Sequence, residues 1–130
     1  METQKIDVIK IAKEMGKISG VAAICLFGSR AKGTERPYSD YDLCVITKPK
    51  ISAKTKDKIL SYSSKIIDTH ILADLPLYLQ FRVLKEAKLL HINSEKDFLE
   101  TRLQVIRKYQ DFRPRLERYY RNILAETKLA

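Results

Sequence analysis

Apolar residues along the chain fall into two kinds of pattern, one typical of buried strands and one typical of amphipathic helices. Val21–Phe27 is a continuous apolar run, as expected for a strand that is covered on both faces. Residues 41–47, which contain the apolar run Leu43-Cys44-Val45-Ile46, predict a second strand. A third strand is predicted over residues 65–72, interrupted by the acidic Asp68, and a short edge strand over residues 89–92. These runs predict a small β-sheet.

Between these runs, apolar residues recur every three or four positions, which is the spacing of an amphipathic helix. Ser52, Asp74 and Ser94 stand where side chains cap helix N-termini, and Pro114 is tolerated in the first turn of a new helix. Strands that alternate with helices predict an α/β fold, in which a small mixed sheet is flanked by helices and followed by C-terminal helices. The predicted helices cover residues 3–18, 30–32, 52–64, 74–88, 95–110 and 114–127.

Length and cysteine content limit the kind of protein. A chain of 130 residues fits one domain, with a core over about residues 1–92 and helices over about residues 93–130. No apolar run approaches the roughly 20 residues of a transmembrane helix, and the N-terminus lacks a secretory signal, so we expect a cytoplasmic location and no membrane partner. Cys25 and Cys44 lie inside predicted strands without a Cys or His at ligand spacing, so both are expected to be buried, reduced thiols.

The charge of the chain is strongly positive and unevenly distributed. The formal net charge is +9 at pH 7. Residues 101–130 carry eight Lys/Arg against three Asp/Glu, whereas the first 100 residues carry 17 against 13. A basic segment of this kind favours a polyanionic ligand or an acidic protein partner, although a solvated, solubilising surface has the same composition.

The most informative polar residues follow the first predicted strand. Gly28-Ser29 ends that strand, and after ten residues come two aspartates, Asp40 and Asp42, at the start of the second strand. Side chains two apart on a strand point to the same face, so the two carboxylates are predicted to point at one spot. Glycine lets the backbone approach a phosphate closely, and Ser29 offers a hydroxyl and an N–H at a helix N-terminus. The pattern therefore predicts a phosphate-binding turn beside two carboxylates.

This arrangement suits metal-dependent nucleotidyl transfer. That reaction requires that a triphosphate is held, that developing charge is neutralised and that the attacking hydroxyl is activated. Two divalent ions about 3.5–4 Å apart can serve all three purposes, and Mg²⁺ prefers carboxylate and phosphate oxygens. Asp68 is the candidate third carboxylate, because an unpaired carboxylate inside an apolar strand is costly to bury. The alternative for Asp68 is a strand residue that faces solvent.

Three further residues near this motif have two interpretations each. Arg30 and Lys32 either add positive charge near the triphosphate or lie on an exposed helix face. His70 is two residues after Asp68, so both side chains are predicted to face the same side of the strand. His70 then either ligates a metal or orients a phosphate, or it is a hydrogen-bonded structural residue.

The residues of the motif resemble the minimal nucleotidyltransferase family of the polymerase-β-like superfamily. The family signature is Gly-Ser, ten residues and Asp-x-Asp, matched here by Gly28-Ser29 and Asp40-Tyr41-Asp42. Asp68 matches the third acidic residue of the family by its place in the next apolar strand. The resemblance implies an α/β fold that uses two Mg²⁺ ions and a nucleoside triphosphate, usually ATP. It implies catalytic and metal-binding roles for Asp40, Asp42 and Asp68, and nucleotide binding by Gly28, Ser29 and Arg30.

The resemblance also implies a partner. Family members of this length are similar to the antitoxins of bacterial and archaeal toxin–antitoxin pairs. Their partner is an all-helical HEPN ribonuclease, which they silence by transferring AMP from ATP to a tyrosine hydroxyl. The implied function is that of a Mg²⁺-dependent protein adenylyltransferase that neutralises a HEPN toxin.

Two other functions stay open at the level of sequence. A nucleotidyltransferase that modifies a small hydroxylated molecule, such as an aminoglycoside, generally needs an additional C-terminal helical domain, whereas residues 95–127 supply about two helices and are net basic. A non-catalytic module would bind single-stranded nucleic acid through arginines interleaved with Tyr109, Tyr119 and Tyr120. Against nucleic-acid binding, Tyr119 and Ile123 are four residues apart, which is the spacing of a packed helix face.

Overall fold

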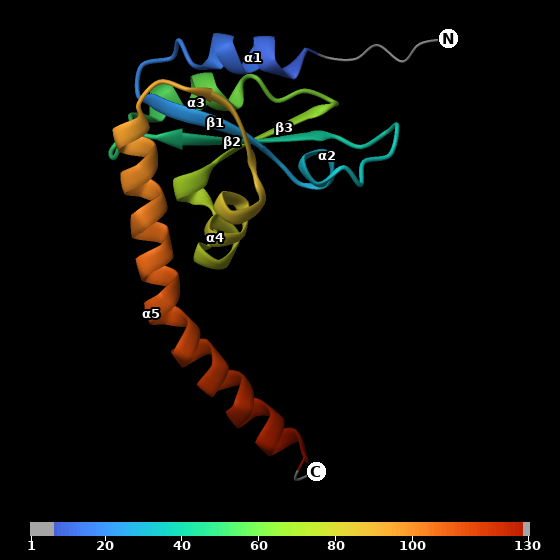
Figure 1. Cartoon of the computed structure of the whole chain (residues 1–130), viewed down its shortest axis with the longest axis vertical. Coiled ribbons are helices and arrows are strands. Elements are labelled where there is room, and N and C mark those ends of the chain that lie inside the picture. Colours follow the sequence, from blue (N-terminus) through green and yellow to red (C-terminus); the bar gives the residue numbers. More distant parts are fainter. Residues whose placement is uncertain (1–6, 129–130) are drawn as a thin grey trace.

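A four-stranded mixed sheet forms the centre of the protein, whose computed structural model describes residues 7–128 (Figure 1). The two central strands, β1 (Val21–Phe27) and β2 (Tyr41–Thr47), are antiparallel. At one edge β3 (Ile67–Ile71) runs parallel to β2, and at the other β4 (Lys88–Ile92) runs antiparallel to β1. The order β3-β2-β1-β4 confirms the predicted mixed sheet and places the two long apolar runs at its centre.

Helices connect the strands, and two of them begin at residues that the sequence identifies as caps. The helical elements are α1 (Val8–Met15), α2 (Ser29–Lys32), α3 (Ala53–Leu60), the 3₁₀ turn η1 (Leu72–Asp74), α4 (Leu77–Glu86) and α5 (Glu95–Lys128). The Ser52 hydroxyl accepts a hydrogen bond from the Thr55 N–H (3.1 Å) at α3, and the Ser94 hydroxyl accepts one from the Asp97 N–H (3.2 Å) at α5. Residues 3–6 of the first predicted helix lie outside the described residues.

Both faces of the sheet are covered, which explains the consecutive apolar residues of β1 and β2. On one face, Met15 of α1 and Ile59 of α3 belong to the same buried cluster as Leu43 of β2. On the other face, Val83 of α4 belongs to a cluster with Cys44 of β2. Figure 1 shows α1 and α3 on one side of the sheet and α4 on the other. A strand between two such layers has no solvent-facing side, so its middle positions exclude polar residues.

The two cysteines lie in this core as free thiols. Cys25 and Cys44 are paired across β1 and β2. Burial raises the pKa of the Cys25 thiol to about 11. Burial, and to a lesser extent the neighbouring Cys25, also raises the pKa of Cys44. Both thiols therefore stay protonated at neutral pH, and the prediction that they are buried is confirmed.

The start of α4 differs from the prediction, because Asp74 does not cap this helix. Asp74 ends η1, and its carboxylate forms an ion pair with Lys56 of α3 at 3.1 Å. The helix begins only after Pro76, since a proline favours extended backbone at the residue before it, and ψ of Leu75 is 151°. The first helical residue is therefore Leu77 rather than a residue at or directly after Asp74.

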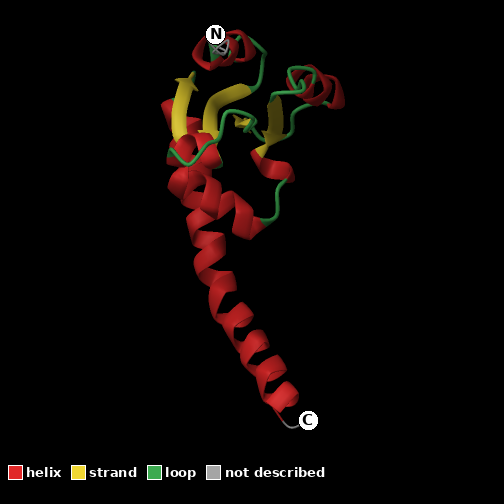
Figure 2. Ribbon diagram, turned by 90° about the vertical axis from the view of Figure 1, so that its right-hand side faces the viewer, coloured by secondary structure: helices red, strands yellow, loops and turns green. Residues whose placement is uncertain are grey.

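The C-terminal region also differs from the prediction, because one helix, α5, replaces the two that Pro114 was expected to separate. Pro114 lacks the N–H that would bond to the carbonyl of Gln110, which normally interrupts a helix. However, the apolar residues keep helical spacing across it, from Val105 and Tyr109 to Leu116. The distal part of α5 leaves the domain (Figures 1 and 2). Among residues 7–128, no helix combines the length and apolar character required to cross a membrane.

Candidate functional site

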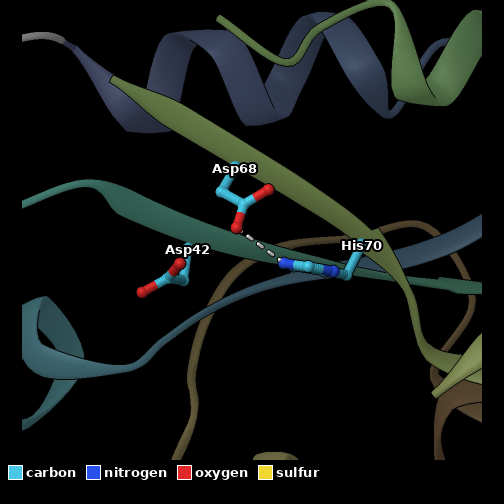
Figure 3. A group of neighbouring side chains, drawn as sticks. All are labelled: Asp42, Asp68 and His70. Atoms are coloured by element: carbon cyan, nitrogen blue, oxygen red, sulfur yellow. Dashed lines mark hydrogen bonds and ion pairs between the residues drawn. The ribbon is translucent and has the colours of Figure 1, made fainter. Parts of the chain in front are cut away.

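The parallel pairing of β2 and β3 places Asp42 directly beside Asp68. The two residues are register partners, and Cys44 is paired in the same way with His70. Because side chains alternate along a strand, Asp42, Asp68 and His70 project from the same face of the sheet (Figure 3). One ligand atom of each of the three lies within 4.8 Å of the others. The predicted shared orientation of Asp68 and His70 is thereby confirmed.

His70 is held by two contacts. Its Nε2–H donates a hydrogen bond to Oδ2 of Asp68 at 2.9 Å (Figure 3). Its ring stands edge-on to that of Phe27 of β1, with the ring centroids 5.7 Å apart. A histidine bonded in this way fixes the orientation of the carboxylate. Of the two interpretations from sequence, the structure shows the one in which His70 is a hydrogen-bonded residue.

The reason for expecting a third carboxylate at Asp68 was wrong in one respect. The Asp68 side chain is 54% exposed, so its carboxylate is not buried inside an apolar strand. β3 is an edge strand, and its buried positions alternate with exposed ones: Ile67, Thr69 and Ile71 are buried and Asp68 is exposed. The carboxylate therefore lies at an open edge of the sheet, where a second large molecule can approach it.

Asp42 is the carboxylate with the least favourable surroundings. It is half-buried, and this burial is the largest of the effects that raise its pKa above the usual range. The carboxylates of Asp68 and Asp40 raise the pKa further, whereas His70 lowers it. The group thus concentrates negative charge that the neighbouring imidazole only partly balances. A divalent cation is the ligand that would relieve this imbalance.

Asp40 lies directly before β2, and its predicted role as a metal ligand stays a prediction. It is exposed and precedes β2, which begins at Tyr41, and it is not part of the group formed by Asp42, Asp68 and His70. Ladder pairing begins at the Tyr41 N–H, which donates to the carbonyl of Ile66 at 2.8 Å. Asp40 therefore sits in the preceding loop rather than on the strand, although its charge acts on Asp42.

The Gly28-Ser29 turn lies against the Asp42 carboxylate. Gly28 has φ 75° and ψ −156°, a conformation that is essentially restricted to glycine. A Cβ at this position would collide with Oδ2 of Asp42 and lie 3.2 Å from its Cγ. Phe27 is the register partner of Asp42, so the end of β1 delivers the turn to this point. The turn and the carboxylate can be this close only because residue 28 has no side chain.

The positively charged residues of α2 are both engaged with other groups. The Nε–H of Arg30 donates to the carbonyl of Ser39 at 3.0 Å, and its guanidinium lies 4.0 Å from the centre of the Tyr41 ring. Arg30 thus connects the Gly-Ser turn to the loop that carries Asp40. Lys32 forms an ion pair with Glu86 of α4 at 3.1 Å.

A cavity of about 230 Å³ lies between the Gly-Ser turn and α4. Its walls combine apolar side chains with two cations, Lys32 and Arg82, and one carboxylate, Glu86. Arg82 was not identified from the sequence, because only the packing of α4 against the end of β1 brings it to this turn. The residues that line the cavity are Phe27, Gly28, Lys32, Leu79, Arg82, Val83 and Glu86.

Residues 7–96 match the protein family described as polymerase beta, nucleotidyltransferase. The chain belongs to this family. The match includes the whole sheet and all the residues of the group at Asp42, and it ends at the start of α5. The family resemblance inferred from Gly28-Ser29 and Asp40-Tyr41-Asp42 is therefore confirmed. No protein of curated function matches this nucleotidyltransferase in sequence.

Solved structures of toxin–antitoxin pairs share the fold. One, a toxin–antitoxin with AMP-PNP, has a chain that is 22% identical, with a TM-score of 0.67 over 90% of this chain and 95% of that chain. Another is a tri-AMPylated Shewanella oneidensis HEPN toxin in complex with MNT antitoxin, at 19% identity and TM-score 0.62 over 90% and 92%. A third is the toxin–antitoxin MntA-HepT, at 20% identity and TM-score 0.61 over 90% and 93%. At these identities the likeness establishes the fold.

Proposed function

We propose that this nucleotidyltransferase is an antitoxin that transfers AMP from ATP to a tyrosine of a HEPN ribonuclease toxin and thereby neutralises it. The observation that carries the proposal is the pair of carboxylates, Asp42 and Asp68, facing one another beside the Gly28 turn. Phosphate-binding backbone next to uncompensated carboxylates is the arrangement required to hold a metal-bound triphosphate.

The donor atoms fit a divalent cation with a preference for oxygen. Asp42 and Asp68 would hold the ion, and Asp40 on the adjacent loop would complete the set of carboxylates. When bound, two Mg²⁺ ions supply neutralisation of the triphosphate and polarisation of the attacking hydroxyl. Imidazole is an uncommon Mg²⁺ ligand, so His70 is better suited to orienting Asp68 than to direct ligation.

The other residues of the site would bind the nucleotide. The backbone of Gly28 and Ser29 would approach the phosphates, which a side chain at residue 28 would prevent. Arg30 would keep the turn and the Asp40 loop in a fixed relation through its contacts with Ser39 and Tyr41. The cavity beside α4 would offer the rest of ATP apolar walls and the cations Lys32 and Arg82, both of which are paired with Glu86.

The exposure of the site favours a protein acceptor. Asp68 lies on an edge strand and is mostly exposed, so a hydroxyl on the surface of another protein can reach the carboxylates. Chains of similar fold occur in structures with AMP-PNP and with a tri-AMPylated HEPN toxin, which supports ATP as donor and a HEPN protein as acceptor. A small-molecule acceptor is less well supported, because the described C-terminal region is one helix, α5, whose distal part leaves the domain (Figure 1).

The test is incubation of the protein with its cognate HEPN partner, Mg²⁺ and ATP labelled at the α-phosphate. We expect label on a tyrosine of the partner, together with a mass increase of one or more AMP groups and loss of ribonuclease activity. Asp42→Asn should abolish labelling, whereas Asp57→Asn, on the exposed face of α3, should label normally. A partner that is bound and inhibited without any label would contradict transfer, and label on a small hydroxylated molecule instead would contradict the protein acceptor.

A further inference from the structure

The distal part of α5 has an apolar stripe whose side chains are largely exposed. Its residues follow one another at intervals of three or four, so they share one side of the helix. We call them the α5 stripe: Phe112, Leu116, Tyr119, Tyr120 and Ile123. Tyr119 and Tyr120 are 60% and 55% exposed, which is high for large side chains. The prediction that Tyr119 and Ile123 belong to a packed face therefore fails within residues 7–128.

The α5 stripe continues a helix face that is packed closer to the domain. Val105 is buried, and the ring of Tyr109 stacks on that of Phe81 of α4, with centroids 4.1 Å apart and planes 9° apart. Phe112 and Leu116 follow Tyr109 by three and seven residues, so these three side chains lie on the same side of α5. The face that packs on α4 thus extends beyond the domain, where α4 no longer covers it (Figure 2).

Alternating intervals of four and three are typical of a seam that packs against another helix. The stripe is bordered by charged residues: Lys108 and Arg115 lie on one side and Arg113 on the other. Arg113 forms an ion pair with Glu117 at 3.0 Å. Lys108 and Arg115 are seven residues apart, so they occupy equivalent positions along the other border. In paired helices these border positions determine which partner is accepted.

The charge of this segment distinguishes between the candidate partners. Residues 107–121 carry six Lys/Arg and two Asp/Glu. A second copy of the chain would bring these like charges together along the whole seam, which is unfavourable. A partner helix with acidic residues beside its apolar positions would place its apolar side chains on the α5 stripe and its carboxylates beside the bordering Lys and Arg residues.

We propose that the distal half of α5, residues 112–127, docks an acidic amphipathic helix of the partner protein. This rests on the proposed function in that the partner is taken to be the protein that accepts AMP. The stripe would supply affinity and the bordering cations would select an acidic helix over a neutral or basic one. Docking on a helix that extends from the domain would tether the acceptor to the nucleotidyltransferase while leaving the site itself open.

The first test uses a synthetic peptide and the full-length protein. The probe is a helical peptide of about 28 residues with Leu at positions a and d and Glu at e and g of each heptad. We expect it to bind, followed by fluorescence anisotropy, with an affinity that falls as salt is added. The same peptide with Lys in place of Glu should bind at least about tenfold more weakly. Failure of the acidic peptide to bind, or equal binding of both peptides, would overturn the proposal.

Matched variants separate the stripe from the rest of the helix. Leu116→Asp puts a charge in the centre of the stripe, and Ala125→Asp puts the same charge on the opposite, exposed side of α5. We expect the first to weaken binding of the acidic peptide by about tenfold or more and the second to leave it nearly unchanged. Circular dichroism of both variants controls for loss of the helix.

Two more measurements identify other occupants. Light scattering that shows a dimer of the wild type and a monomer of Leu116→Asp would overturn the proposal in favour of a second copy. Salt-sensitive binding of polyuridylate to wild type and Leu116→Asp alike, without peptide binding, would overturn it in favour of nucleic acid. Docking and catalysis are separable: Leu116→Asp should keep Mg²⁺-ATP binding but label the HEPN partner poorly, whereas Asp42→Asn should keep peptide binding and lose labelling.

Discussion

At the scale of single residues, the structure places a carboxylate where it opposes folding. Asp42 is half-buried, and two other carboxylates act on it, so its pKa is raised above the usual range. A raised pKa means that the folded protein binds the proton more tightly than the unfolded chain does. The ionised Asp42 therefore lowers the free energy of unfolding at neutral pH, and protonation relieves this effect as the pH falls through the raised pKa.

The first prediction concerns this residue. Asp42→Asn should raise the melting temperature in EDTA at neutral pH, because it removes the charge that the fold disfavours. The gain should shrink as the pH falls through the raised pKa of Asp42, because the wild-type carboxylate then takes up a proton. Thermal unfolding of both proteins across this pH range measures the effect. A variant less stable than wild type at neutral pH would contradict the cause assigned to the shift.

Addition of Mg²⁺ is the control for Asp42→Asn. Bound metal stabilises only the folded protein, so the wild type should gain stability as Mg²⁺ is added. The variant should gain much less stability, because it has lost the carboxylate that binds the metal and whose charge the metal would neutralise. Equal gains for the two proteins would place the metal elsewhere.

The second prediction concerns Gly28. Gly28→Ala should destabilise the fold by about 1–3 kcal/mol and displace the Asp42 carboxylate, because the new Cβ meets Oδ2 of Asp42 and the backbone is strained. Gly33→Ala is the matched control: Gly33 also has φ 75°, but no atom lies within 4 Å of a Cβ there. We expect Gly33→Ala to cost only backbone strain, about 1–2 kcal/mol.

The two glycine variants should differ most in metal binding. Gly28→Ala should weaken Mg²⁺ binding and AMP transfer, whereas Gly33→Ala should leave both nearly intact. Urea unfolding and Mg²⁺ titration of the purified proteins measure the two effects. Equal loss of Mg²⁺ affinity in both variants would show that backbone strain, and not the contact with Asp42, controls the site.

At the scale of elements, α5 shows how a repeating pattern outweighs a local signal. Proline at residue 114 was expected to begin a new helix, since it removes one backbone hydrogen bond from a helix interior. The helix continues through it because residues on both sides supply regular helical hydrogen bonds and keep the same apolar spacing. The sequence contains this phase relation between Tyr109, Phe112 and Leu116, which is the signal that would have corrected the prediction.

The third prediction follows for this helix. Pro114→Ala should add the hydrogen bond to the Gln110 carbonyl and stabilise the distal helix locally by up to about 3 kcal/mol. Hydrogen exchange should slow over residues 110–118, whereas the melting temperature of the domain should change little, because this part of α5 does not pack on the sheet. Faster exchange in the variant would contradict a continuous helix through residue 114.

At the scale of the whole molecule, one side chain joins distant parts of the chain. The amide of Asn93, which follows β4, donates to the carbonyl of Gly16 at 2.6 Å and to that of Val21 at 3.0 Å. Its Oδ1 accepts a hydrogen bond from His91 at 2.7 Å. Asn93 thus fastens the end of β4 and the start of α5 to the loop between α1 and β1. His91 lies on the edge strand, as predicted, and serves this connection.

The fourth prediction tests this connection. Asn93→Ala should lower the free energy of unfolding by about 1–2 kcal/mol, because two carbonyls lose these donors and water can replace them only in part. Asn122→Ala, on exposed α5, is the control and should change it by less than about 0.5 kcal/mol. Urea denaturation measures both, and Mg²⁺ binding should be unaffected by either. A small effect of Asn93→Ala would mean that water replaces the lost amide readily.

The strands, the mixed sheet and the family follow from local sequence. Consecutive apolar residues identify β1 and β2, and the interval between Gly28-Ser29 and Asp42 identifies the family, because strand and turn residues act through near neighbours in the chain. The start of α4 and the continuity of α5 were harder to predict from the sequence. Both depend on how Pro76 and Pro114 are accommodated, which near neighbours and packing decide together.

Local patterns in the sequence identify the strands, the Gly-Ser turn and the available carboxylates. The three-dimensional fold brings two of these carboxylates side by side. Asp42 and Asp68 are 26 residues apart, and the parallel register of β2 and β3 makes them partners, whereas Asp40, two residues from Asp42, lies in a loop. The physical reason is that strand register depends on backbone hydrogen bonds between segments distant in the chain, which no local spacing specifies.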